Sequence, residues 1–178
     1  MWCVRARSLV VAVVAGMLAG LMPGQMALAK DIRIVALGAS NTYGKTVSRS
    51  QAYPAHLQRM LKARGINARV ANMGRNGKPT RWMVRKAKSI PRGTRLVILQ
   101  PGGNDRRHGI SSAVRRRNIS RIKNILRRKG IKVIVLRNRT IGQLGKRYPR
   151  PDGSHFTPAG YRALAATLLP QVLSAIGR

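Results

Sequence analysis

Four short apolar segments, rich in Val, Ile and Leu, recur along the chain from residue 32 onward. They cover residues 32–37, 68–71, 96–99 and 132–136. Continuous apolar runs of this length are typical of strands that are buried on both faces of a sheet. We therefore expect four buried strands.

Longer segments in which apolar residues recur at helical spacing alternate with these strands. They predict helices over Ala52–Ala63, Thr80–Ser89, Ser111–Lys129 and Pro158–Ile176. A Gly or Pro follows each of the first three, as is common where helices end. Thr157 is expected to cap the last helix and Pro158 to occupy its first turn, whereas Pro170 should kink or shorten it.

The alternation of strands and helices predicts an α/β fold with a short parallel sheet covered on both faces, that is, a three-layer α/β/α sandwich. In such sheets ligands bind at the carboxyl ends of the strands. Four stretches of small and polar residues follow the predicted strands: GASNTYG (38–44), NMGRNG (72–77), PGGND (101–105) and, after a longer connection, DGSH (152–155). Functional residues are therefore expected at this edge.

The first 29 residues have the pattern of a secretory signal peptide. Arg5 and Arg7 precede an apolar stretch of moderate length, and an A-x-A cleavage site ends at Ala29. A membrane anchor is the alternative, but Gly and Pro interrupt a run that is short for a bilayer. We expect residues 1–29 to be removed, residues 30–178 to form one domain, and the protein to be periplasmic or secreted.

Positive charge dominates the composition, with 36 Lys and Arg against 3 Asp and Glu. Such a surface attracts polyanions. For an exported protein these would be anionic lipid, lipopolysaccharide or acidic polysaccharide, and no dedicated nucleic-acid partner is expected. A basic face that is merely solvated is an equally open alternative.

Much of this charge lies in residues 81–88, 114–129 and 136–150. In the second segment Ile119, Ile122 and Leu126 can line one face of a helix. The basic residues on the solvated remainder would then be Arg115, Arg116, Lys123, Arg127 and Arg128.

Acidic and metal-ligating residues are scarce. Asp31, Asp105 and Asp152 are the only acids, and two of them lie within the GGND and DGSH stretches. The only cysteine, Cys3, would leave with the signal peptide, so neither a disulfide nor a thiolate nucleophile is expected. With three histidines and no cysteine left, we expect no metal and no cofactor.

The stretch GASNTYGKT (38–46) raises two alternatives. Its Gly38, Gly44, Lys45 and Thr46 are residue types of a phosphate-binding loop, whereas Ser40, on a turn that leaves a strand, could be a nucleophile. A nucleotide-hydrolysing loop needs Mg²⁺ held partly by an acid at the end of another strand. No predicted strand ends in an acid, which favours the nucleophile.

Taken together, the four stretches resemble, in order and spacing, the conserved blocks of the GDSL or SGNH hydrolase family. The resemblance covers most of the chain after residue 30 and implies a flavodoxin-like SGNH hydrolase fold. It also implies kinship with exported acyl thioesterases, lysophospholipases and arylesterases.

The resemblance implies a role for five residues. Ser40 would be the nucleophile, His155 the general base and Asp152 the residue that orients the imidazole. The oxyanion would be held by the backbone N–H groups of Ser40 and Gly77 and by the side-chain amide of Asn104. Each residue also has a structural alternative, since these residue types are common in turns and caps. His56 and His108 are expected on the surface or in packing.

Two departures from the family pattern stand out. Ala39 replaces the aspartate of Gly-Asp-Ser, so it is open how firmly the turn around Ser40 is held. The connection from Leu136 to Asp152 is short where family members carry a further strand and helix, which favours small or surface-bound acyl groups.

The sequence thus predicts an exported serine esterase or thioesterase that acts through an acyl-enzyme on a small-molecule or lipid ester. A carbohydrate O-acetyl esterase is one alternative. A catalytically silent protein that binds polyanions or anionic surfaces is another.

Overall fold

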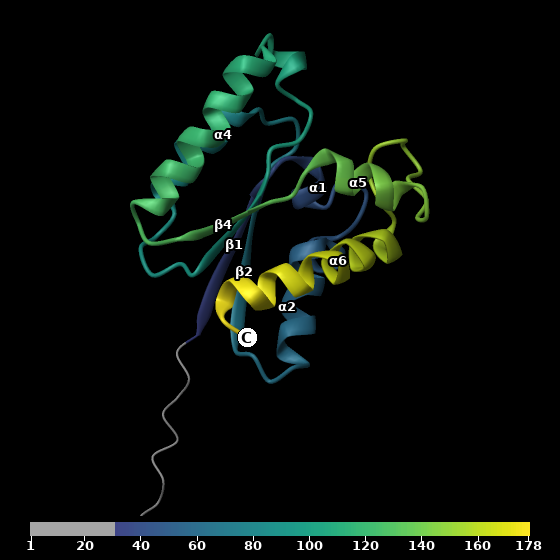
Figure 1. Ribbon diagram of the computed structural model, residues 1–178. Helices are drawn as coiled ribbons and strands as arrows, with labels where there is room; N and C mark the ends of the chain where they lie inside the picture. Colours follow the sequence, from purple (N-terminus) through teal and green to yellow (C-terminus); the bar gives the residue numbers. More distant parts are fainter. Residues whose placement is uncertain (1–30) are drawn as a thin grey trace, which may run out of the picture.

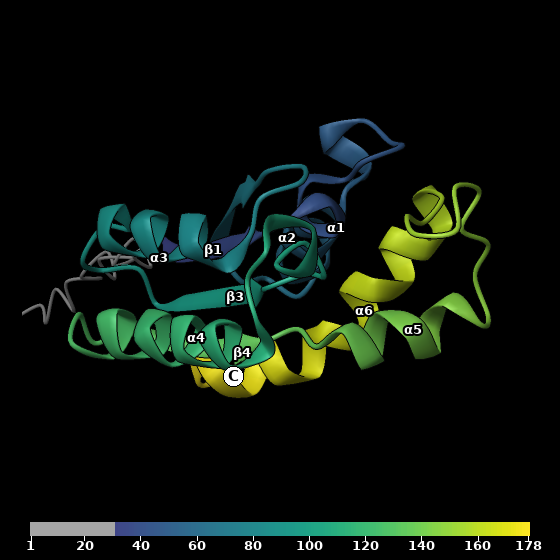
Figure 2. The same cartoon turned by 90° about the horizontal axis from the view of Figure 1, so that it is seen from above.

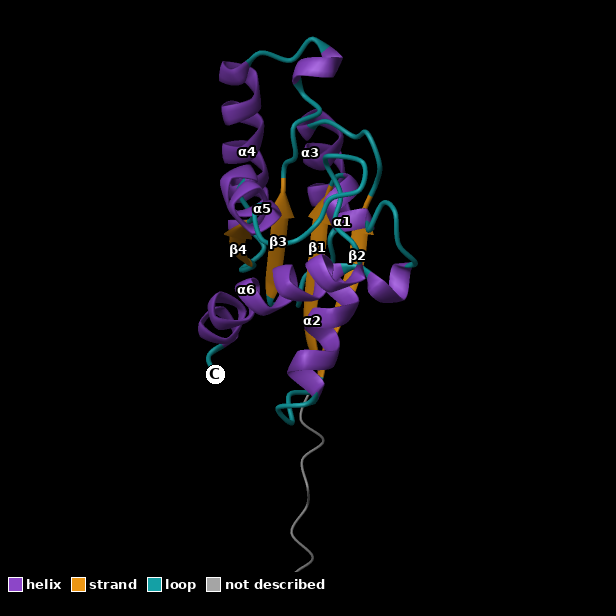
Figure 3. Ribbon diagram, turned by 90° about the vertical axis from the view of Figure 1, so that its right-hand side faces the viewer, coloured by secondary structure: helices purple, strands orange, loops and turns teal. Residues whose placement is uncertain are grey.

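The computed structural model describes residues 31–178. The predicted signal peptide, residues 1–29, lies outside these residues. Four strands form one sheet: β1 (Ile32–Gly38), β2 (Ala68–Gly74), β3 (Leu96–Gln100) and β4 (Lys132–Val135). Their order is β2-β1-β3-β4 and all neighbours are parallel, as Figure 3 shows.

Helices cover both faces of this sheet. The longer ones are α2 (Tyr53–Lys62), α3 (Thr80–Ser89), α4 (Ser112–Arg127) and α6 (Pro158–Ile176). Side chains of α3 and α4 pack on one face of the sheet and those of α2 and α6 on the other. Figure 1 shows α4 on one side of the strands and α2 and α6 on the other. The predicted three-layer sandwich is therefore confirmed. None of the helices within residues 31–178 combines the length and apolar character needed to cross a membrane.

The strands bury alternate side chains in two cores, because successive residues of a strand point to opposite faces. Ile34 and Ile98 pack against α2 and α6, whereas Val35 and Leu99 pack against α3 and α4. The parallel register places Ile34 beside Leu96 and Gly38 beside Gln100. The ends of β1 and β3 are thus level at the edge where the predicted functional stretches begin.

The structure also contains elements that the pattern did not predict. They are α1 (Ser40–Tyr43), the 3₁₀ turns η1 (Arg49–Gln51) and η2 (Arg106–His108), and α5 (Asn138–Gly145). Helix α5 lies in the short connection after β4 and packs against α6 (Figure 2). Strand β2 continues three residues beyond its predicted end, to Gly74.

Pro170 was expected to kink or shorten the last helix. It does not shorten it, because α6 continues through Pro170 to Ile176. Proline removes one N–H and leaves the carbonyl four residues earlier without its helical partner. Here that carbonyl belongs to Ala166, and both Ala166 and Pro170 are exposed. Water can therefore satisfy the unpaired group.

Candidate active site

Ser40 stands on a tightly packed turn at the end of β1, where it is the first residue of α1. Glycine is required at two positions against which this turn packs. A Cβ on Gly38 would overlap the side chain of Thr42, and a Cβ on Gly74 would overlap the backbone of Tyr43. The two glycines allow α1 to lie directly on the ends of β1 and β2.

Gln100, the last residue of β3, holds this turn. Its buried Oε1 accepts hydrogen bonds from the Ala39 N–H at 3.0 Å and from the Thr42 hydroxyl at 3.2 Å. Ala39 itself is buried. The turn around Ser40 is thus fixed by an amide side chain from a neighbouring strand. No motif in the sequence predicts this role of Gln100.

His155 and Asp152 approach Ser40 from the segment before α6. The distance from His155 Nε2 to Ser40 Oγ is 2.7 Å, and that from His155 Nδ1 to Asp152 Oδ2 is 2.6 Å. The other carboxylate oxygen of Asp152 accepts the backbone N–H groups of Ser154 and His155 at 3.0 and 2.8 Å. Residues more than a hundred positions apart in the chain thus form one hydrogen-bonded series.

The series fixes the direction of each hydrogen bond. An ionised carboxylate only accepts, so His155 Nδ1–H donates to Asp152. In a neutral imidazole Nε2 is then unprotonated and accepts from the Ser40 hydroxyl. A serine with a base at its hydroxyl and a carboxylate behind that base is equipped for nucleophilic attack.

Asp152 is kept ionised by its surroundings. The hydrogen bond from His155, followed by that from the Ser154 N–H, holds the pKa of the Asp152 carboxyl well below its usual range. Lys45 Nζ lies 3.7 Å from Asp152 Oδ2 and adds a positive charge on the solvent side. The sequence had suggested for Lys45 only a place in a phosphate-binding loop.

Lys45 and Thr46, which follow α1, connect the turn of Ser40 to the residues around His155. The Thr46 hydroxyl donates to the carbonyl of Phe156 at 3.0 Å, and the Tyr161 hydroxyl donates to that of Lys45 at 3.0 Å. Thr46 has φ 81°, a conformation that a β-branched residue rarely adopts. These contacts across the chain hold it there.

The spacing of its glycines and the presence of α1 exclude a phosphate-binding loop for the stretch GASNTYGKT. Residues 39–43 separate Gly38 from Gly44, one residue more than that motif has. Helix α1 also occupies the positions that would have to cradle the phosphate.

A cavity of about 470 Å³ opens in front of Ser40 and His155. Its lining comes from the Ser40 turn, the loop and 3₁₀ turn after β3, helix α5 and the segment before α6. These residues are Ala39, Ser40, Asn41, Gln100, Gly102, Gly103, Asn104, Arg106, Arg107, Asn138, Ile141, Gly142, Arg150, Gly153, Ser154 and His155.

Asn104 and Gly77, the other two residues expected at the site, differ in their relation to the cavity. Asn104 lines the cavity, and its amide donates to the carbonyl of Lys78 at 3.3 Å. Gly77 is not among the lining residues. It has φ 69°, and its carbonyl lies 2.8 Å from His108 Nε2. His108 therefore contacts the loop that carries Gly77. The sequence did not predict this contact.

Asp105, the acid of GGND, has a structural role. It is buried, and its Oδ1 accepts the N–H and the hydroxyl of Thr80 at 3.2 and 2.5 Å. A carboxylate at a helix N-terminus is favoured by the unpaired N–H groups there. Asp105 thus fixes the start of α3 and, with it, the loop of Gly77 and Lys78.

Arg115 is an exception to the expected solvated face of α4. Its Nη2 donates to the carbonyl of Gly102 at 2.9 Å, and its Nε lies 3.6 Å from Asp105 Oδ2. The placement of Arg115 on the outer face was therefore wrong, because the buried charge of Asp105 attracts it inward. Ile122 and Leu126 are buried as expected, and Ile119 is partly buried.

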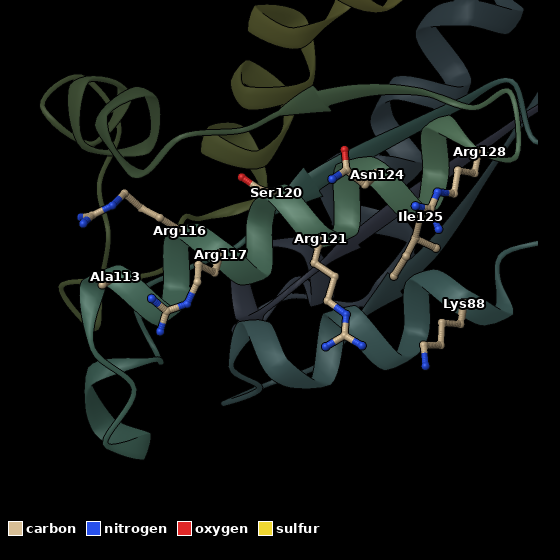
Figure 4. Close-up of a pocket in the computed structure, with 9 residues that line it drawn as sticks. All are labelled: Lys88, Ala113, Arg116, Arg117, Ser120, Arg121, Asn124, Ile125 and Arg128. Atoms are coloured by element: carbon tan, nitrogen blue, oxygen red, sulfur yellow. The ribbon is translucent and has the colours of Figure 1, made fainter.

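A larger hollow of about 760 Å³ lies away from Ser40, between α3 and α4 (Figure 4). It is bordered by Lys88, Ala113, Arg116, Arg117, Ser120, Arg121, Asn124, Ile125 and Arg128. We refer to it as the α3–α4 groove. None of its lining residues carries a negative charge. A search of residues 31–178 finds no group of three or more His, Cys, Asp or Glu side chains that could hold a metal ion.

Comparison with known proteins identifies the family. A sequence profile of the GDSL-like lipase/acylhydrolase family matches residues 36–153, so the chain belongs to this family. It is accordingly an ester-hydrolysing serine hydrolase. No curated protein sequence matches the chain significantly.

Solved structures show the same fold. TesA superposes with a TM-score of 0.69 at 20% identity, over 80% of this chain and 99% of TesA. AlinE4, an SGNH-hydrolase family esterase, gives 0.59 at 26% identity, over 84% and 99%. The psychrotrophic esterase EstA from Pseudoalteromonas sp. gives 0.64 at 12% identity, over 83% and 100%. The predicted SGNH hydrolase fold is confirmed.

Proposed function

We propose that Ser40, His155 and Asp152 are the catalytic residues of this hydrolase. The observation that carries the proposal is the unbroken series of hydrogen bonds from the Ser40 hydroxyl through His155 to Asp152, at 2.7 and 2.6 Å. A serine hydroxyl is a weak nucleophile until a neighbouring base removes its proton.

In this mechanism the Ser40 oxygen attacks the ester carbonyl while His155 Nε2 takes its proton. The imidazolium, stabilised by Asp152, then protonates the leaving alkoxide or thiolate. Water next attacks the acyl-enzyme, with His155 again as the base, and releases the acid and free Ser40.

The negative oxygen of each tetrahedral intermediate needs hydrogen-bond donors. We assign this role to the N–H of Ser40, the N–H of Gly77 and the side-chain amide of Asn104. The N–H of Ser40 lies in the first turn of α1, where helical N–H groups have no partner within the helix. Asn104 lines the cavity, which supports its assignment. The role of Gly77 rests on the family resemblance.

We infer that the acyl group is small. Ala39 and Ile141 are the apolar side chains that line the cavity, and glycines and polar residues make up the rest. A long alkyl chain would gain little there, since apolar burial contributes only about 25 cal/mol per Å² of apolar area. Short-chain carboxylic esters and thioesters fit best, and O-acetyl groups of a carbohydrate are the nearest alternative. Export of the mature domain to the periplasm or medium is part of the same proposal.

The α3–α4 groove supports a second proposed property, attachment to an anionic surface such as lipid, lipopolysaccharide or acidic polysaccharide. Lys88, Arg116, Arg117, Arg121 and Arg128 border it without a carboxylate (Figure 4). A protein that only binds such surfaces would keep this groove but would not need the hydrogen-bonded Ser40. The site geometry favours an enzyme.

The test measures hydrolysis of para-nitrophenyl acetate and of longer-chain esters by the mature protein. Ser40→Ala and His155→Ala should each lower kcat by at least about 10³-fold. An organophosphonate should label Ser40, as mass spectrometry of the digested protein would show. Ser120→Ala, a serine of the remote α3–α4 groove, is the matched control and should retain activity and labelling. Full activity of Ser40→Ala would overturn the mechanism.

A further inference from the structure

We propose that the substrate carries an anionic group, a carboxylate or a phosphate, beside the ester that Ser40 attacks. The inference rests on the proposed function and adds a substrate class to it. It comes from the arginines that line the cavity in front of Ser40.

Three arginines contribute to this cavity from two separate parts of the chain. Arg106 and Arg107 belong to η2, which follows β3, and Arg150 lies in the segment between α5 and His155. Positively charged residues thus border the cavity from the η2 loop and from the segment before α6. Because guanidinium groups bind carboxylate and phosphate oxygens through paired hydrogen bonds, this arrangement suits an anion.

The chain has no acid left to neutralise these arginines. Its three acids are all engaged elsewhere: Asp31 with Arg69, Asp105 with Arg115 and Thr80, and Asp152 with His155 and Lys45. Among residues 31–178, no ion pair includes Arg106, Arg107 or Arg150. Like charges that share a cavity repel one another, and a bound anion relieves that repulsion.

Arg150 is more confined than a surface arginine. Its guanidinium lies over Gly145, the last residue of α5, where a Cβ would come within 2.5 Å of Arg150 Nε. The side chain is half-buried. Glycine at position 145 therefore leaves room for the guanidinium of Arg150, a residue that lines the cavity. Confinement lowers the entropy that a side chain loses when it binds a ligand.

The rest of the lining is polar and agrees with this substrate class. Asn41, Asn104 and Asn138 contribute amides, and Ile141 is the one large aliphatic side chain among the lining residues. A small charged group finds hydrogen-bond donors here, whereas a hydrocarbon chain finds almost no apolar wall.

The anion could belong to the acyl half of the ester or to its alcohol half. Two pairs of substrates separate these cases. Monoethyl succinate against ethyl succinamate places the charge on the acyl half, and para-acetoxybenzoate against para-acetoxybenzamide places it on the leaving group. In each pair the neutral amide replaces the carboxylate with little change of shape.

The measurement is kcat/KM for each substrate with the mature protein at low ionic strength. In at least one pair we expect the anionic ester to exceed its neutral partner about tenfold or more. In Arg150→Gln and Arg106→Gln this ratio should fall several-fold, and Arg150→Lys should restore part of it. Melting temperatures of the variants report whether each folds.

The matched control is Arg64→Gln, an exposed arginine just after α2 and outside the cavity lining, which removes the same charge from the molecule. Its ratio should equal that of the unmutated protein. Equal kcat/KM for the anionic and neutral members of both pairs would overturn the inference, as would an Arg64→Gln effect as large as that of Arg150→Gln. If no ester of any kind is cleaved, the proposed function itself fails, which is a different result.

Discussion

Gln100 joins the end of β3 to the turn that carries Ser40. Its buried Oε1 is shared by the Ala39 N–H and the Thr42 hydroxyl. Ala39, which stands where the family motif has aspartate, offers no side-chain acceptor of its own. The position of Ser40 therefore depends on an amide that is sixty residues away in the sequence.

Replacing Gln100 by Leu tests this dependence. The change leaves a buried N–H and a buried hydroxyl without their acceptor, which should lower the free energy of unfolding by about 1–3 kcal/mol. It should also lower kcat more than it raises KM, because the Ser40 oxygen loses its fixed position. Urea unfolding and ester hydrolysis measure the two effects.

The matched control is Gln171→Leu on the exposed side of α6, which should change neither quantity. A Gln100→Leu protein with unaltered kcat would show that the turn positions Ser40 without the hydrogen bonds to Gln100.

At the scale of elements, Lys129 joins the ends of two helices. It follows α4, and its ammonium group lies 3.4, 2.5 and 2.7 Å from the carbonyl oxygens of Ala87, Lys88 and Ile90, where α3 ends. Carbonyls at a helix C-terminus lack intrahelical partners and favour a cation. One lysine thus caps α3 and fixes it against α4.

Lys129→Ala should therefore lower the free energy of unfolding by about 1–2 kcal/mol. Lys123→Ala, on the exposed face of α4, removes an equal charge and serves as the comparison. Removing a positive charge from so basic a molecule should by itself relieve repulsion. A stability of Lys129→Ala equal to that of Lys123→Ala would contradict the capping role.

For the whole molecule, two groups make stability fall as the pH is lowered. Burial, followed by the charges of Arg59 and Arg162, lowers the pKa of His56 below its ordinary value. Hydrogen bonds lower that of Asp152. In both cases the unfolded chain binds a proton at a higher pH than the folded chain does, so protons favour unfolding.

The expected pH profile has two parts. The contribution of His56 to the free energy of unfolding is complete above pH about 6.5. It is lost as the pH falls below that value toward the lowered pKa of His56. The contribution of Asp152 is complete above pH about 4 and is lost below it. Urea unfolding between pH about 8 and 5 should show a decline that His56→Gln removes. Parallel curves for the two proteins would contradict the role of His56.

The sequence by itself determined the layers of this molecule and the edge of the sheet at which the candidate site lies. Apolar runs indicated the strands, and helical spacing of apolar residues indicated the covering helices. Both patterns arise because the buried face of a segment requires apolar side chains at regular positions within that segment. The resemblance of GASNTYG, NMGRNG, PGGND and DGSH to the blocks of the GDSL or SGNH family indicated Ser40, Asp152 and His155. Helices α1 and α5 were missed because they are too short for their spacing to stand out.

Only the tertiary structure decided how these residues are held and what surrounds them. Gln100 beneath Ala39, Lys45 beside Asp152 and the inward turn of Arg115 depend on contacts between segments far apart in the chain. A pattern of polarity records that a side chain is buried or charged, but not which partner it meets. The convergence of Arg106, Arg107 and Arg150 on the cavity of Ser40 is a property of the folded sheet edge, where separate loops are brought together.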